Sequence, residues 1–430
     1  MSGLEKCSIG VGDRFGREGI AQLAALQSAA QRGLSITPVW NKSYREHTII
    51  GTSPDDTRRR ADEAVTAAGW KSGYFVDADH IGLATVDGFM AACDFFTIDV
   101  ADLIGRPASE ESEADFLRAM SPFTGTVPIP GLPAPLEITP EVLKGVARKY
   151  ASAVEEAERV YRHIEQAKGG TPFIIEVSID EADAPQTPTE LFLILGALAE
   201  HRVPVQTIAP KFSGSFLKGI DYVGDIQAFA SEFAADLAVV AFARTSFGLP
   251  EGLKLSVHSG SDKFSLYPIM HRALVAAGAG LHLKTAGTTW LEEVIGLAAA
   301  GGEGLRLAKD LYAGALARFE EMAQPYRAVI DIDRSRLPSV REVNSWPARD
   351  YVETLEHDPS RQLCNLHFRQ LIHISFRLAT EMGRRFTDLL EQNRATIAPL
   401  VTANLLHRHI EPLFLGGTNQ APDHRPPEIT

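Results

Sequence analysis

Short runs of apolar and β-branched residues recur along this chain of 430 residues, and most are separated by stretches with helical spacing. There are eight: 7–12, 35–40, 73–76, 95–100, 172–179, 203–208, 253–257 and 281–283. Alternating strands and helices are typical of βαβ units, which build a parallel sheet. Eight strands with intervening helices close a (β/α)8 barrel of roughly 250 residues or more. We therefore predict an α/β fold, a TIM barrel over residues 1–302.

Local signals place several of the helices. Ser53, followed by Pro54, predicts a helix start, and so does Thr139, followed by Pro140. The second of these helices should continue to Lys168, before two glycines. Two capping boxes, Thr187 with Glu190 and Thr289 with Glu292, predict two further helices.

Three segments depart from the repeated pattern. Residues 103–136 are rich in Pro, Ser and Glu and are predicted to be an inserted loop. Residues 303–416 are helical without convincing strands, which predicts a C-terminal helical extension packed on the barrel or on a partner subunit of a homo-oligomer. Residues 417–430 are rich in Pro and polar residues, so we expect a disordered tail.

Composition excludes several classes of protein. The formal net charge of -13 disfavours nucleic acid and anionic lipid as partners. No apolar run is long enough to predict a membrane span, and the three widely separated cysteines are typical of reduced thiols. We expect a cytoplasmic protein. The glycines after the first run have the wrong spacing for a dinucleotide fingerprint.

Polar residues gather where the apolar runs end. The run 253–257 leads into His258, Ser259, Ser261, Asp262 and Lys263, and the run 281–283 contains His282 and leads into Lys284. Asp77, Asp79 and His80 follow 73–76, while Glu176, Ser178 and Asp180 share one parity. The carboxyl ends of the strands meet at one face of a barrel, where the active sites of such barrels lie. These residues therefore predict a site.

A divalent metal fits this mixture of imidazole and carboxylate. Our candidate ligands are His80, Glu176, His258 and His282, one from each of four strand ends. Zinc is the first choice, with manganese, nickel or cobalt as alternatives. Any single histidine could instead be a hydrogen-bonded core residue. A carboxylate inside a strand needs a partner, so Glu176 is a ligand, a base or the partner of a cation such as Lys211.

Lys211, Lys263 and Lys284 each follow a strand beside small residues. A lysine there could bind a carboxylate or phosphate, transfer protons or form a Schiff base. Each could equally form an ion pair with Asp262 or Glu176. Four histidines of the C-terminal extension are expected to be surface or packing residues, one of which could close the site: His367, His373, His407 and His409.

Four long motifs carry a family resemblance: PFIIEVSIDEAD, APKFSGSFLKGIDYVGD, LKLSVHSGSDKFSLYP and LHLKTAGTTWLEE. Together they resemble the tagaturonate epimerase family, from about Gly10 into the C-terminal helices. The resemblance implies a metal-dependent enzyme of sugar-acid catabolism that interconverts tagaturonate and fructuronate. It also implies that Glu176, His258 and His282, and with them His80, bind one metal ion.

The two keto-uronates differ at a carbinol carbon beta to the ketone, whose C–H proton simple enolisation does not acidify. We therefore hypothesise retro-aldol cleavage and re-addition. Asp79 or Asp180 would act as acid or base, with Lys211 as a further catalytic candidate. Four residues would bind substrate: Lys263, Lys284, Ser259 and Asp262.

Two other functions remain open from the sequence. The same residues would serve a metal-dependent aldolase that releases its fragments. A non-catalytic barrel that binds sugar or supports a partner subunit is the second alternative. Several buried charges at strand ends would have no use in such a scaffold.

Overall fold

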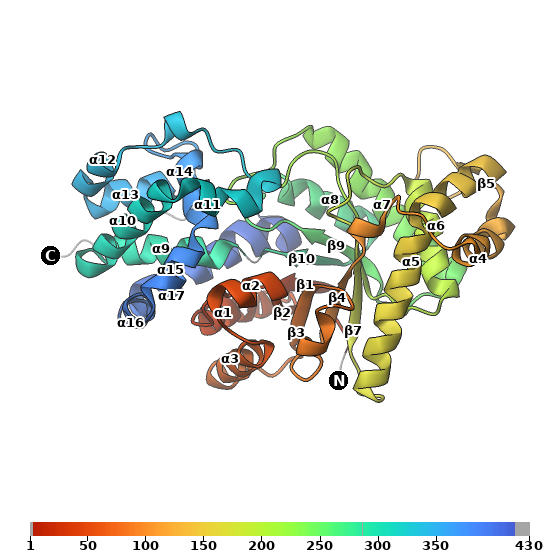
Figure 1. Ribbon diagram of the computed structural model, residues 1–430, viewed down its shortest axis with the longest axis horizontal. Coiled ribbons are helices and arrows are strands. Elements are labelled where there is room, and N and C mark those ends of the chain that lie inside the picture. Colours follow the sequence, from red (N-terminus) through yellow and green to blue (C-terminus); the bar gives the residue numbers. More distant parts are fainter. Residues whose placement is uncertain (1–2, 286, 418–430) are drawn as a thin grey trace.

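The computed structural model describes residues 3–285 and 287–417, and a closed barrel of eight parallel strands lies at its centre (Figure 1). The strands are β1 (Cys7–Gly10), β2 (Ile36–Ser43), β3 (Phe75–Ile81), β4 (Phe95–Asp99), β7 (Ile174–Ser178), β8 (Thr207–Ala209), β9 (Lys254–His258) and β10 (Leu281–Lys284). Around the barrel their order is β1-β10-β9-β8-β7-β4-β3-β2. The predicted TIM barrel with a helical C-terminal part is confirmed, and each of the eight predicted runs forms one strand.

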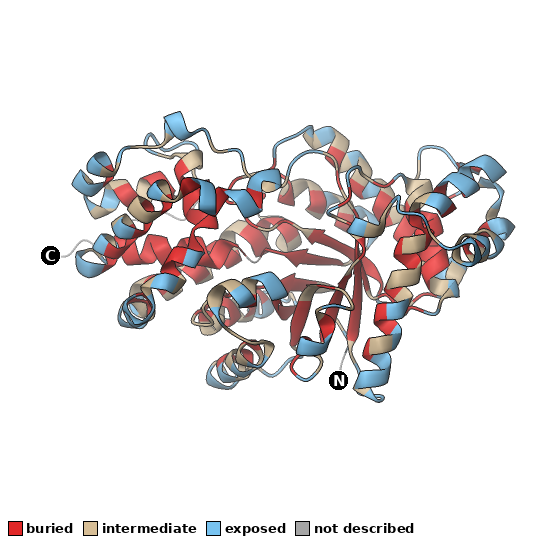
Figure 2. Cartoon of the chain, viewed as in Figure 1, coloured by how far each residue is buried: buried red, intermediate tan, exposed pale blue. Residues whose placement is uncertain are grey.

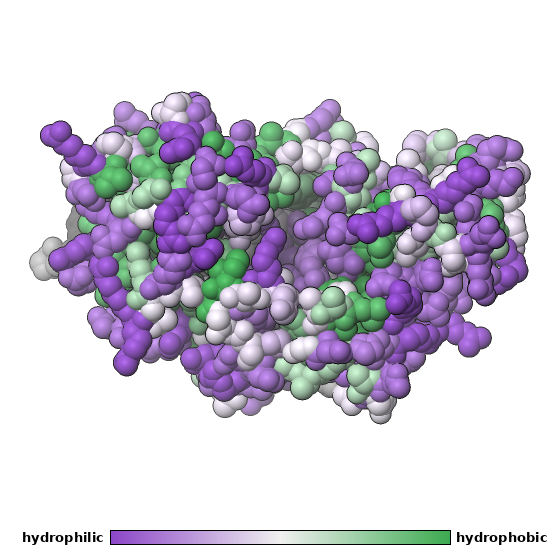
Figure 3. Space-filling model, in the orientation of Figure 1, coloured by the Kyte–Doolittle hydropathy of each residue, from purple (hydrophilic) through white to green (hydrophobic). Residues whose placement is uncertain are grey.

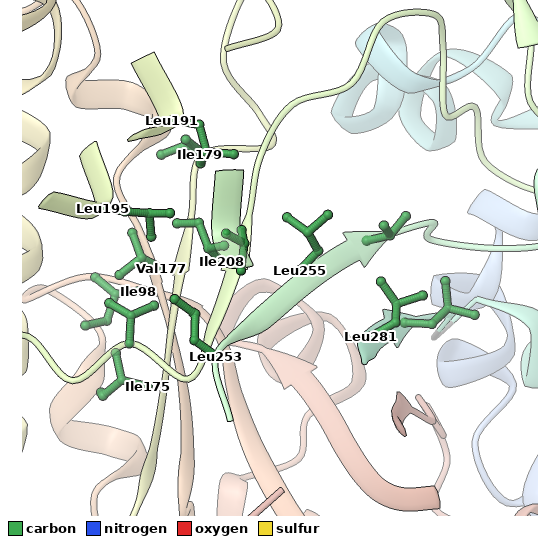
Figure 4. Close-up of a cluster of buried hydrophobic side chains, with 14 of the residues drawn as sticks. Ile98, Ile175, Val177, Ile179, Leu191, Leu195, Ile208, Leu253, Leu255 and Leu281 are labelled. Atoms are coloured by element: carbon green, nitrogen blue, oxygen red, sulfur yellow. The ribbon is translucent and has the colours of Figure 1, made fainter. Parts of the chain in front are cut away.

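Alternation along the strands separates two apolar groups. Outward-facing residues such as Val177 and Ile208 pack against Leu191 and Leu195 of α6 (Pro188–Glu200) (Figure 4). Inward-facing residues close the amino-terminal end of the barrel: Val39, Phe75, Phe95 and Ile174, with Leu4 beside them. The barrel is therefore plugged at one end, and its polar interior residues lie towards the carboxyl ends of the strands.

The helices around the barrel are α1 (Gly19–Gln31), α2 (Tyr44–Ile50), α3 (Pro54–Ala67), α5 (Pro140–Lys168), α6, α7 (Ile226–Phe247), α8 (Tyr267–Ala277) and α9 (Thr288–Ala299). The starts predicted at Ser53, Thr139 and Thr187 are confirmed. The capping box predicted at Thr289 is wrong, because α9 begins at Thr288 with Gly287 as its N-cap, so Thr289 lies inside the helix. The Thr289 hydroxyl instead accepts from Gln22 Nε2 (2.9 Å), and Glu292 accepts from Asn404 Nδ2 (2.8 Å).

The segment predicted as an inserted loop is partly regular. It contains α4 (Glu110–Met120) and two antiparallel strands, β5 (Gly125–Val127) and β6 (Leu136–Ile138). Ser109 caps α4 through its hydroxyl, which accepts from Ser112 N. Helix α4 packs on α5 and α6, at the opposite end of the molecule from the C-terminal helices (Figure 1). Apolar residues such as Phe116 and Met120, at helical spacing among the polar residues, bury one face of this helix.

The C-terminal extension consists of helices and their connecting turns, without a strand among the residues described. Its α-helices are α10 (Gly302–Ala317), α11 (Phe319–Ala323), α12 (Val340–Ser345), α13 (Ala348–Leu355), α14 (Leu366–Ile374), α15 (Phe376–Met382), α16 (Arg384–Gln392) and α17 (Arg394–Ala403). Short 3-10 turns, η4 (Gln324–Val329) and η5 (Arg334–Arg336), connect some of them, and the π-helix η6 (Asn404–Leu415) ends the described chain. The expected disordered tail lies almost wholly outside the described residues.

Helix α9 joins the extension to the barrel. Trp290, Leu291 and Val294 are fully buried in a second apolar core that they share with α10 and α14. Figure 2 shows the result: the barrel strands and α9 are buried, while the outer helices expose one face. Among the described helices only α7 is long and apolar enough to cross a bilayer, a test that core helices also pass, and α7 packs on α6 and α8.

Candidate active site

Lys284, at the end of β10, lies at the centre of a buried charge cluster. Its ammonium is 2.8 Å from Asp77, 2.9 Å from Asp79 and 2.8 Å from Glu176. Burial disfavours the charge, but the three carboxylates outweigh burial and hold the pKa of Lys284 well above its usual value. Burial also raises the pKa of Asp77 to about 7. Lys284 is thus a fixed cation that holds three carboxylates from two strands together, two from β3 and one from β7.

His258, at the end of β9, bridges two carboxylates of the β7 segment. Its Nε2 is 2.8 Å from Glu176 Oε1, and its Nδ1 is 3.1 Å from Asp180 Oδ2. Although burial opposes protonation, Asp180 and Glu176 raise the pKa of His258 to about 9. Burial likewise opposes ionisation of Glu176, yet Lys284 and His258 hold its pKa well below the usual value. The parity predicted for Glu176, Ser178 and Asp180 brings the first and last of them to the same imidazole.

His80 reaches the same place through an irregularity in β3. Strict alternation would turn His80 away from the barrel interior that Asp77 and Asp79 face. The register with β4 shifts between Ala78 and Ile81, and His80 has a left-handed φ of 52°. Bulges at strand ends re-aim side chains in this way. The His80 ring consequently lies 5.1 Å from that of His258, with its Nδ1 2.7 Å from Asp99 Oδ2.

Ligand atoms of His80, Asp180 and His258 all lie within 4.8 Å of one another, a grouping that could hold a metal ion. Two imidazoles and a carboxylate suit zinc and similar divalent ions. Of the four predicted ligands, the structure brings His80 and His258 into this group and adds Asp180, which we had predicted as an acid or base. Glu176 adjoins the group through its hydrogen bond to His258.

His282 lies deeper in the barrel than this group. Its Nδ1 is hydrogen-bonded to Ser8 Oγ (2.9 Å), and its ring packs 5.3 Å from that of Phe95. Its Nε2 is buried and has no hydrogen-bond partner among the described residues. Burial lowers the pKa of His282 to about 3, so the ring is neutral. A metal ion at the His80 group would instead have to displace the protons that, against the effect of burial, neighbouring carboxylates hold on His80 and His258, whose pKa values are raised to about 10 and about 9. A neutral imidazole with a free nitrogen fits a ligand role, but the structure does not place His282 within the His80 group.

Three of the predicted substrate-binding residues lie apart from the charge cluster. Asp262 is fully buried, and its oxygens contact Arg369, His357 and Thr288. The Lys263 ammonium donates to backbone oxygens, including those of Leu217 (3.1 Å) and Ile220 (2.8 Å). Ser259 Oγ donates to the Lys284 carbonyl (2.8 Å). These contacts hold the loop after β9 in place and occupy the groups expected to meet substrate.

Lys211 is partly buried, and its backbone N–H donates to Gln186 Oε1 (2.8 Å). It is not the partner of Glu176, a role that Lys284 fills. Sequence reasoning also missed the hydroxyls that bind Glu176: Thr97 donates to Oε1 (3.2 Å) and Thr207 to Oε2 (2.7 Å). Both threonines lie at inward-facing positions of their strands. This alternation is the sequence signal that could have identified them.

The face of the molecule in Figure 3 is hollowed near its centre, where hydrophilic residues surround the recess. A cavity of about 580 Å³ borders the loop after β1, with Arg14, Trp40, Lys42, Arg59 and Glu391 among its lining residues. None of the strand-end acids or histidines lines it. We place the active site at the strand ends because mutually perturbed ionisable groups converge there.

Comparison with known proteins shows the family of this chain. The family model of tagaturonate epimerase matches residues 1–413. The tagaturonate/fructuronate epimerase of Thermotoga maritima is 29% identical over 427 residues, which cover 94% of this chain and 80% of that protein. A crystal structure of fructuronate-tagaturonate epimerase from Cohnella laeviribosi with one glycerol is 25% identical and has a TM-score of 0.79, covering 96% of this chain and 82% of that one.

The native crystal structure of the same Cohnella laeviribosi epimerase has a TM-score of 0.78 over the same shares of the two chains. The match thus includes the barrel, the strand-end cluster and nearly all of the helical extension. This chain belongs to the tagaturonate epimerase family, whose members are isomerase-type enzymes.

Proposed function

We propose that this enzyme interconverts D-tagaturonate and D-fructuronate with the help of one divalent metal ion, by retro-aldol cleavage and re-addition. The relatives named for this reaction support the substrate pair. The observation that carries the proposal is the grouping of His80, Asp180 and His258 beside the Lys284 charge cluster at the strand ends. This arrangement offers both a metal site and ionised acids at the carboxyl ends of the strands.

Retro-aldol chemistry suits the carbon that must be inverted. A base removes the proton of the hydroxyl on this carbon, whose bond to the neighbouring carbon then breaks. The electron pair moves towards the ketone, and an aldehyde forms at the former carbinol carbon. Rotation of the aldehyde and re-addition on its other face restore the bond with inverted configuration, so all atoms are retained.

The metal group and Asp79 have different roles in this reaction. A metal ion held by His80, Asp180 and His258 would supply Lewis-acid polarisation of the substrate ketone. Asp79 is the best placed base, because its side chain is 14% exposed whereas the side chains of Asp77 and Glu176 are inaccessible. Lys284 and His80 hold the pKa of Asp79 below its usual value against the effect of burial, which keeps the carboxylate ionised.

The test combines metal analysis with an epimerisation assay in D₂O. We expect purified enzyme to contain about one equivalent of zinc, manganese, nickel or cobalt and to lose activity on chelation. No solvent deuterium should enter at the inverted carbon, and an added aldehyde should capture the nucleophilic three-carbon fragment. Deuterium at that carbon would refute the retro-aldol route. Mass balance separates an epimerase from an aldolase, because only the aldolase accumulates smaller products.

A further inference from the structure

Lys218 lies in the loop between β8 and α7, and its ammonium group lies beside the loop after β9. Its backbone is fixed on both sides: Lys218 N donates to Val329 O (2.8 Å), and Gly219 N donates to Ser261 Oγ (2.9 Å). The ammonium lies beside Gly260, where a Cβ would be only 3.1 Å from Nζ. Gly260 comes two residues after His258, and Asp180 is among the carboxylates whose charge acts on Lys218, so Lys218 lies near the candidate metal site.

His373, on α14, adjoins the same loop. A Cβ added at Gly219 would lie 3.2 Å from the Cβ of His373, and His373 is only 1% exposed. Neither ring nitrogen has a hydrogen-bond partner among the described residues. Buried polar groups are nearly always hydrogen-bonded, so an unsatisfied buried imidazole indicates a missing partner.

Arg14, in the loop after β1, completes the group. Its guanidinium lies 3.9 Å from the ring centroid of Phe376, three residues after His373. The side chain is 10% exposed, yet Nε and Nη1 have no hydrogen-bond partner among the described residues. Glu46 Oε1 lies 3.9 Å from Nε, too far for a hydrogen bond. A guanidinium so enclosed normally binds a planar anion through two parallel hydrogen bonds.

The charges around these three side chains leave a positive potential. Burial lowers the pKa of Lys218, and Arg14 and Arg45 lower it further, against the weaker effects of Glu181 and Asp180. Burial, and then Arg14 and Lys218, hold the pKa of His373 well below its usual value. In a chain with a net charge of -13, a local positive potential around these three side chains favours the binding of an anion.

We infer that Arg14 and Lys218 bind the carboxylate of the sugar acid and that His373 donates a further hydrogen bond to it. This inference rests on the proposed function, and it predicts how the substrate is oriented in the active site. The carboxylate end would lie towards Arg14 and Lys218, and the reacting carbons would lie over His80, Asp180 and His258. In the retro-aldol route the aldehyde fragment keeps the carboxylate, so the same contacts would retain that fragment while it rotates.

The first experiment compares the keto-uronate with the neutral ketohexose that carries CH₂OH in place of the carboxylate. Lys218→Met and Arg14→Met should each lower kcat/KM for the keto-uronate by about 10-fold to 100-fold, mainly through KM. Activity on the neutral ketose should change by less than about 2-fold. Lys218→Arg should recover part of the loss. The matched control is Lys71→Met, an exposed lysine beyond α3, which should leave both activities unchanged.

An equal loss on both substrates, or no loss on either, would overturn the inference. Circular dichroism and thermal melting of each variant show whether the fold is intact.

A binding experiment separates this inference from the proposed reaction. Calorimetry with D-gluconate and D-glucitol, open-chain compounds that differ only in a carboxylate, needs no turnover. Metal-loaded wild type should bind gluconate at least about 10-fold more tightly than glucitol, and Lys218→Met should remove the difference. Equal binding by wild type would refute the carboxylate site. Lys218-dependent gluconate binding without epimerisation would support the carboxylate site and refute the proposed function.

Discussion

Asp262 and Arg369 form a fully buried ion pair, with Oδ2 and Nη2 2.6 Å apart, between the loop after β9 and helix α14. His357 Nδ1 lies 3.0 Å from the same oxygen. The Arg369 guanidinium also donates to the carbonyls of Gly219 and Leu355, both at 2.6 Å. One side-chain pair therefore fastens the C-terminal helices to two loops at the mouth of the barrel.

Asp262→Asn should destabilise the protein by about 3–5 kcal/mol, because it leaves the buried Arg369 charge unpaired. Urea denaturation measures this loss. The folded enzyme should keep the KM of wild type, since both Asp262 oxygens serve the helices. A normal free energy of unfolding with a strongly raised KM would instead support the substrate-binding role predicted from the sequence. Asp388→Asn, at a half-exposed aspartate of α16, is the matched control.

Lys284→Met should abolish activity and lower the free energy of unfolding by about 3–5 kcal/mol. The variant removes the cation that Asp77, Asp79 and Glu176 share, and leaves three carboxylates close together in the barrel. Adding Asp77→Asn removes one of these charges, so the double variant should be more stable than Lys284→Met alone. If the two changes were additive, the proposed coupling would be absent.

His258→Ala and His80→Ala should each lower bound metal to below about a tenth of an equivalent, because either change leaves too few protein ligands for a tight site. Elemental analysis of the purified proteins measures this, and circular dichroism confirms folding. His163→Ala, which removes an exposed histidine of α5, should keep the wild-type metal content. Full metal occupancy in both site variants would exclude the His80 group as the metal site.

Glu293→Gln should make the protein more stable in alkaline solution. Glu293 is fully buried, neither of its oxygens has a hydrogen-bond partner among the described residues, and burial raises its pKa well above 4.5. The folded protein therefore keeps a proton that the unfolded chain releases above pH 4.5. The stability that this group contributes is complete below that pH and is lost as the pH rises, by at most about 1.4 kcal/mol per pH unit.

Because glutamine does not titrate, the advantage of the Glu293→Gln variant in urea denaturation should grow between pH 6 and pH 9. Some loss of stability with pH should remain in the variant, since burial also raises the pKa of Glu18 and of Glu292 to about 8. Glu251→Gln, at an exposed position, should follow wild type at every pH. Parallel curves for Glu293→Gln and wild type would contradict the predicted protonation.

Part of the active site at the strand ends could be predicted from local sequence pattern. Parity along β7 correctly placed Glu176 and Asp180 on one side, and the ends of β9 and β10 supplied His258 and Lys284 to the same cluster. Parity alone would have turned His80 outwards. Its position depends on the register shift in β3 and a left-handed φ, which no local composition signals.

Pairing between distant residues was the part that the sequence could not supply. Asp262 and Lys263 resemble ligand-binding residues in a Gly- and Ser-rich loop, but their partners are an arginine 107 positions further along and carbonyls of another loop. His373 was expected to be a surface or packing residue, and it is buried beside the mouth of the barrel. Only folding of the extension onto the barrel decides these contacts.

The order of apolar runs and helix starts by itself determined the eight-stranded barrel, because period-two alternation and capping act between near neighbours in the chain. Which charged side chains meet substrate and which only hold loops together was decided by the tertiary structure. The physical reason is that a buried charge takes its role from the partner that neutralises it, and for Lys284 and Asp262 these partners come from other strands and helices.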